Sequence, residues 1–106
     1  MKIVVVEPHK PAYTKEIRSG LASLQHEVGG FIEALYPFED EVALICNEEG
    51  KLNEMPLNRA LRDEDGTIYD IIVGIFLVVG LTKNNFGSLT EEQIETYLAR
   101  YAIPEY

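Results

Sequence analysis

The chain has 106 residues, a hydrophobic fraction of 46% and a formal net charge of −9. This length suits one domain over residues 1–106, and the hydrophobic content argues against a disordered chain. A protein this acidic is repelled by phosphate backbones, so direct binding to nucleic acid is disfavoured.

Targeting signals and cysteine usage indicate the setting of the protein. The longest nearly uncharged stretch, 71–82, is too short to span a bilayer, and the acidic Glu7 interrupts the N-terminal apolar run. Cys46 is the single cysteine, so the chain forms no internal disulfide, which fits a reducing compartment. We therefore expect a cytoplasmic protein that does not contact a membrane.

The first half of the chain predicts strands around one helix. Residues 2–7 are mostly β-branched and predict a strand, and residues 13–17 alternate weakly, as in an edge strand. Apolar residues at helical spacing predict a helix over 18–28, which the next two glycines would end. Residues 31–36 predict a strand, and the uniformly apolar 42–46 predicts a central strand covered on both faces.

The second half predicts a short helical turn, more strand and a final helix. Residues 56–62 predict a single helical turn, with Asn58 as its N-cap. Residues 67–81 hold the last strand material, interrupted by Gly74. Thr90 and Gln93 fit a capping box, which predicts a helix from Thr90 to Tyr101.

These elements predict an α+β domain with about five strands in a mostly antiparallel sheet and two helices on one face. The predicted core includes Val42, Leu44, Ile45, Phe76 and Val78. The strands are apolar on both faces, while two helices on one side would leave the other bare. An exposed apolar face usually marks an interface, so we expect a homo-oligomer, most simply a dimer.

Four runs of the sequence carry a family resemblance: 28–33 (VGGFIE), 36–38 (YPF), 43–53 (ALICNEEGKLN) and 56–60 (PLNRA). Over nearly the whole chain they resemble the small domain family of unknown function numbered thirty-eight forty-six. The resemblance implies a phage, plasmid or transposon origin in a bacterial host, and it implies no activity. Small accessory proteins of such elements are often inhibitors of host defence, which is an analogy of setting.

Metal binding and catalysis have little support in the sequence. His9, His26 and Cys46 are the only soft ligands, and no two of them have a metal-ligand spacing. Cys46 ends an apolar strand, as a small buried hydrophobe does, and a reactive thiolate would need a base such as His26 beside it. No carboxylate spacing singles out an acid and a base. We therefore predict no metal, no cofactor and no enzyme.

The best candidate for a binding site is the polar segment 47–59. Its donors, Asn47, Lys51, Asn53, Asn58 and Arg59, could bind a base edge or a phosphate. The alternative is turn and cap chemistry without a ligand. As an exposed binding residue, Arg59 would be replaceable by Ala at little cost in stability. As a helix cap, Asn58 would lose about 1 kcal/mol on replacement by Ala.

We interpret the chain as a non-enzymatic binding protein that neutralises a component of host defence. In one form, the acidic surface around Glu39, Asp40 and Glu41 caps a basic groove on a protein such as a nuclease. In the other, the segment 47–59 lines a pocket that sequesters a small nucleotide signal. The alternatives from other classes are a small nucleotide-acting enzyme and a structural or regulatory subunit.

Overall fold

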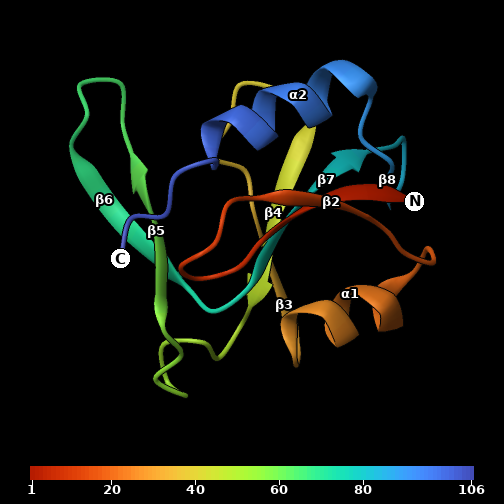
Figure 1. The fold of residues 1–106 in the computed structure, drawn as a ribbon. Helices are drawn as coiled ribbons and strands as arrows, with labels where there is room; N and C mark the ends of the chain where they lie inside the picture. Colours follow the sequence, from red (N-terminus) through yellow and green to blue (C-terminus); the bar gives the residue numbers. More distant parts are fainter.

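The computed structural model describes residues 1–106 as two antiparallel sheets and two helices (Figure 1). The elements in chain order are β1 (Lys2–Val6), β2 (Tyr13–Glu16), α1 (Leu21–Val28), β3 (Ile32–Leu35), β4 (Val42–Asn47), β5 (Leu57–Arg62), β6 (Ile68–Val73), β7 (Phe76–Leu81), β8 (Phe86–Gly87) and α2 (Glu91–Arg100). This confirms the predicted α+β class. Neither helix is long and apolar enough to cross a membrane.

The larger sheet has the order β2-β1-β7-β4-β3, and β8 pairs with β7. The neighbours β1–β2 and β3–β4 are local hairpins, and β7 joins them at the centre. Val78 of β7 pairs with Val4 on one side and with Leu44 on the other. The predicted core is confirmed, because Val42, Leu44, Ile45, Phe76 and Val78 are all fully buried.

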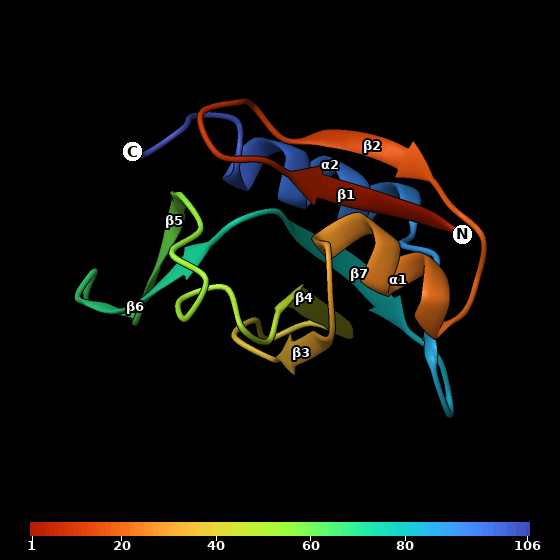
Figure 2. The ribbon, with the colours of Figure 1, turned by 90° about the horizontal axis from the view of Figure 1, so that it is seen from below.

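The two helices lie on opposite faces of this sheet, as Figures 1 and 2 show. On one face α2 places Ile94 against a cluster that contains Val4 and Val78. On the other face α1 places Leu24 in a cluster with Leu77. The prediction that both helices share one face is wrong, because strand side chains alternate and each apolar face needs its own cover. We expected a homo-oligomer because one face of the sheet would be bare, and that argument no longer applies, since each face is covered by a helix.

Local signals explain where the helices begin and end. The Thr90 side chain accepts a hydrogen bond from the Gln93 amide at 3.1 Å, and the Gln93 side chain accepts one from the Thr90 amide at 2.9 Å. This capping box confirms the predicted start of α2. Helix α1 ends at Val28 and is capped by Gly29, whose left-handed φ of 81° suits glycine.

The segment 57–62 is strand β5, not the predicted helical turn. It pairs with β6, and the hairpin turns at Gly66, whose φ is 89°. Leu61 and Ile72 belong to the cluster on the α2 face, so the hairpin covers the part of the sheet that α2 leaves open. Burial between β6 and the large sheet overrides the local helical spacing of this segment.

Candidate functional site: a groove between the β5–β6 hairpin and α2

The five residues predicted as a binding site do not form one surface. Asn58 and Arg59 are fully buried, with 0% and 1% of their area exposed, and Asn47 is buried too. Lys51 and Asn53 are exposed in the turn after β4. The segment is therefore divided between the interior and a surface turn.

Asn58 and Arg59 form a buried polar node, by which we mean these two side chains and their acceptors. The Asn58 amide donates to the carbonyls of Val6 at 2.9 Å and Gly74 at 2.8 Å. Its oxygen accepts from Arg59 Nη1 at 2.8 Å. Arg59 Nη2 donates to the carbonyls of Lys10 at 2.7 Å and Tyr101 at 2.8 Å.

The buried polar node connects β5 to the end of β1, the turn before β7, the loop after β1 and the end of α2. The prediction that these donors are free for a ligand is therefore wrong for Asn58 and Arg59, because the fold uses them. Asn58 is not a helix cap either, since it lies within β5. Only Nε of Arg59 is buried without a partner.

The other three residues act in and around a turn. The Asn47 amide donates to the Val28 carbonyl at 3.1 Å, and its oxygen accepts from the Glu49 amide at 2.8 Å. Lys51 forms an ion pair with Asp70 on β6. For Asn47 this matches the alternative of turn chemistry.

Cys46 lies in a small cleft of about 100 Å³ near this turn. Burial, with the nearby Glu33 carboxylate second, raises the pKa of the thiol to about 11. Its side chain faces the α2 side of the sheet, whereas His26 lies on α1 on the opposite side. The thiol thus remains protonated at neutral pH, and His26 is not placed to act as its base.

A larger hollow of about 570 Å³ lies between the β5–β6 hairpin, the loop 37–40 and α2. We call it the groove. Its carboxylates are Glu39 and Asp40 from the loop and Asp63 and Glu64 from the turn of the hairpin. The predicted acidic surface thus contributes Glu39 and Asp40 to the groove, while Glu41 is exposed but is not part of its lining.

Asp40 holds the wall of the groove in place. Its carboxylate accepts hydrogen bonds from the Glu41 amide at 2.7 Å, from Tyr97 at 3.0 Å and from Gln93 at 3.2 Å. Loss of water around the carboxylate raises its pKa, but these bonds outweigh that effect and lower the pKa. Because Tyr97 and Gln93 are on α2, Asp40 connects the loop to the helix.

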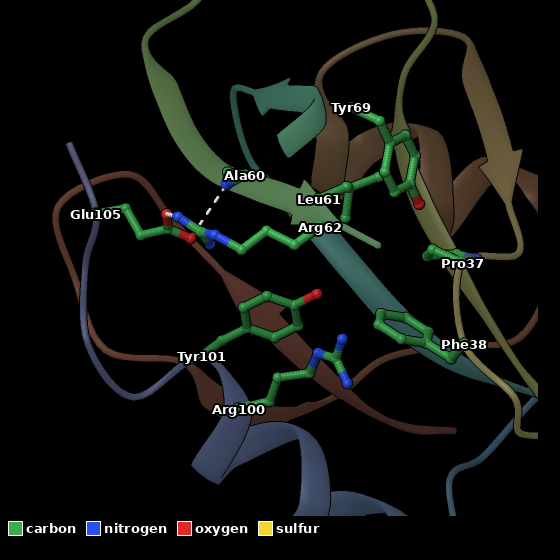
Figure 3. A pocket seen from close by; sticks show the side chains of 9 residues that line it. All are labelled: Pro37, Phe38, Ala60, Leu61, Arg62, Tyr69, Arg100, Tyr101 and Glu105. Carbon is green, nitrogen blue, oxygen red and sulfur yellow. Dashed lines mark hydrogen bonds and ion pairs between the residues drawn. The ribbon is translucent and has the colours of Figure 1, made fainter. Parts of the chain in front are cut away.

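The inner end of the groove is a pocket of about 100 Å³ beside Tyr101 and Glu105 (Figure 3). Here the Arg100 guanidinium lies 4.9 Å from the centre of the Phe38 ring, a favourable cation–π distance. The Phe38 ring in turn lies 4.9 Å from the ring of Tyr97, centre to centre. Tilted and edge-to-face aromatic rings therefore form the wall on which Arg100 lies.

Charge differs along the groove. The outer part carries four carboxylates, and Glu39 and Glu64 form no ion pair or side-chain hydrogen bond. Arg62 and Arg100 line both parts, and Glu105 is the single carboxylate of the inner pocket. Arg62 is paired with Glu105 at 2.8 Å, whereas Arg100 has no carboxylate partner. The exposed Tyr69 ring lines both parts.

This arrangement offers contacts to a basic side chain. Free carboxylates can pair with a basic side chain, and the exposed Tyr69 ring can contact its aliphatic stem. No group of three or more His, Cys, Asp or Glu side chains is placed to hold a metal ion. Sequence reasoning missed Arg62, Tyr69 and Arg100. The only available signal was the unusual number of tyrosines, six in this chain.

Comparison with known proteins gives one match. A family model described as "Domain of unknown function (DUF3846)" matches residues 1–102, which is nearly the whole chain and includes every lining residue of the groove except Glu105. No curated protein and no solved structure matches the chain.

Proposed function

We propose a function for this chain, which belongs to the DUF3846 family of domains of unknown function. In this proposal it is a non-enzymatic protein whose groove binds a basic segment of a partner protein. One observation carries this proposal: two of the four carboxylates that line the groove have no partner within the chain. The net charge of −9 adds long-range attraction for such a segment.

The titratable groups favour binding over catalysis. Every carboxylate with a perturbed pKa has it lowered, namely Asp40, Asp65, Asp70 and Glu105. A general acid at neutral pH needs a carboxyl whose pKa is raised. A nucleotide is a weaker candidate ligand, because its phosphates would meet the carboxylates at the mouth of the groove.

The partner we propose is a host defence protein with a basic surface. This part of the proposal follows from the setting of phages and mobile elements that the resemblance implies, and no contact in the structure specifies it. The inhibition would be steric, because a segment held between the hairpin and α2 is no longer available to its own substrate.

The groove is tested with labelled hexa-arginine and hexa-glutamate peptides, whose binding is followed by fluorescence anisotropy. We expect the wild-type chain to bind the arginine peptide, and the affinity to fall steeply between about 0.01 M and about 1 M salt. The glutamate peptide should not bind.

A double variant, Glu39→Lys with Glu64→Lys, should weaken binding of the arginine peptide about tenfold at low salt, since each lost contact contributes roughly 0.2–1 kcal/mol. The matched control is Glu16→Lys with Glu49→Lys, which makes the same charge change at exposed residues outside the groove. Equal losses in both double variants would mean that net charge, not the groove, binds the peptide, and the proposal would fail.

A further inference from the structure

The end of the chain lies across the inner pocket. After α2, the segment 102–106 passes along the edge of β5 and brings the Glu105 carboxylate to two donors (Figure 3). One oxygen accepts from the Ala60 amide at 3.1 Å, and the other accepts from Arg62 Nη2 at 2.8 Å. A guanidinium and a backbone amide that converge on one carboxylate are a recurrent way to recognise a carboxylate in proteins.

The segment itself is weakly held. Ile103 is 80% exposed and Tyr106 is 42% exposed, so this part of the chain buries little apolar area. Besides the Glu105 contacts, it is anchored by a hydrogen bond between His9 Nδ1 and the Tyr106 carbonyl, which is also exposed. The Arg62–Glu105 ion pair is partly exposed, with side chains 44% and 23% exposed, and surface pairs contribute about 0–1 kcal/mol, so release of the segment costs little free energy.

The walls of the pocket do not depend on the segment. Arg62 and Ala60 are in β5, which is fixed by pairing with β6 and by the buried polar node. Arg100 is on α2 and rests on Phe38. The pocket thus keeps two guanidinium groups when Glu105 leaves, and one of them, Arg100, has no acidic partner even when Glu105 is present.

We propose that the inner pocket is a carboxylate-binding site, with Glu105 as its internal occupant, and that an acidic side chain of a bound peptide displaces Glu105. This rests on the proposed function and deepens it: the partner segment carries basic residues for the outer groove and an acidic residue for the inner pocket. Glu105 then competes with the ligand in cis, so the groove selects segments of mixed charge over purely basic ones.

The test uses the chain of residues 1–106, labelled with ¹⁵N, and a capped pentapeptide that copies residues 102–106. The variant Glu105→Ala vacates the pocket without removing the segment. We expect the peptide to shift the Ala60 amide signal saturably in this variant. The wild type should require about tenfold more peptide, because the tethered Glu105 competes at an effective concentration in the millimolar range.

Three controls make the result specific. In Glu105→Ala, a peptide with Gln in place of its Glu should leave the Ala60 signal unmoved. In the double variant Glu105→Ala with Arg62→Gln, the original peptide should leave the Ala60 signal unmoved. Acetate at the same concentration should cause a much smaller shift. Unchanged signals from the large sheet, such as that of the Val78 amide, show that the variants are folded.

An Ala60 signal that does not respond in Glu105→Ala, or responds equally to the Gln peptide, overturns the proposal. An equal response to acetate shows a site for free anions and overturns the peptide assignment. The proposed function is judged separately, because Glu39→Lys with Glu64→Lys changes hexa-arginine binding without altering Ala60 or Arg62.

Discussion

Arg59 and Arg62 lie in the same short strand, yet they belong to different regions of the molecule. Arg59 is 1% exposed and makes three hydrogen bonds inside the buried polar node. The Arg62 side chain is 44% exposed and has one partner, Glu105, in the groove. The pairing of β5 with β6 is irregular between Leu61 and Arg62. Packing, not residue type, therefore decides which arginine supports the fold and which one remains accessible.

The largest effect is expected for Arg59→Ala. Removal of the guanidinium takes the Arg59 donors away from the Lys10 carbonyl and the Asn58 oxygen, and it opens a cavity; the Tyr101 carbonyl keeps only its hydrogen bond from the Ala12 amide. We expect a loss of about 3–5 kcal/mol in the free energy of unfolding, measured by chemical denaturation. Arg18→Ala, at an exposed arginine without an ion pair, is the control and should change stability by less than about 0.5 kcal/mol.

Asn58→Ala should cost about 2–3 kcal/mol, because the Val6 and Gly74 carbonyls lose their shared donor. Asn58→Asp keeps the shape and the acceptor for Arg59 but removes both donated bonds, so it should destabilise the protein comparably. A loss of only about 1 kcal/mol for Asn58→Ala would fit a cap or turn role and contradict the buried node.

Arg62→Ala should change the free energy of unfolding by less than about 1 kcal/mol, since its ion pair with Glu105 is partly exposed. The same variant should abolish the response of the inner pocket to the acidic pentapeptide. Thermal unfolding and the Ala60 amide signal measure the two effects in one sample. A large loss of stability would mean that Arg62, like Arg59, supports the folded structure, which would contradict the contrast drawn between the two arginines.

The smallest effect is a change with pH. The hydrogen bond from Arg62 lowers the pKa of Glu105 below its ordinary value of 4.5. Because folding lowers the pKa of Glu105, its contact with Arg62 contributes fully to the free energy of unfolding above the ordinary pKa. This contribution is lost as the pH falls through the lowered pKa of the folded state. An NMR titration of the Ala60 amide should therefore show a midpoint below pH 4.5, and Glu105→Ala should remove this transition.

The sequence predicted the large sheet better than the hairpin. The apolar runs of β1, β4 and β7 have no other good interpretation, and the capping box at Thr90 is local information. Strand β5 was missed because Leu57, Ala60 and Leu61 recur at helical spacing. Only pairing with β6 and burial on the sheet, which are not local, make this segment a strand.

The candidate site was predicted in part for the same reason. Glu39 and Asp40 stand next to a turn, so their exposure follows from the sequence. The stacking of Arg100 on Phe38, and the contact of Glu105 with Arg62, join segments that only the fold brings together. Burial of Asn58 and Arg59 could not be predicted, because their four backbone acceptors come from three distant parts of the chain: residues 6–10, Gly74 and Tyr101.

The central place of β7 has a consequence for the order of assembly. The hairpins β1–β2 and β3–β4 can each form from neighbouring residues, but they have no edge in common until β7 is inserted between them. Val4 and Val78 must meet across most of the chain, so a long loop is closed before the sheet is complete. During synthesis each of the two hairpins therefore keeps an unpaired edge until residues 76–81 have left the ribosome and can form β7.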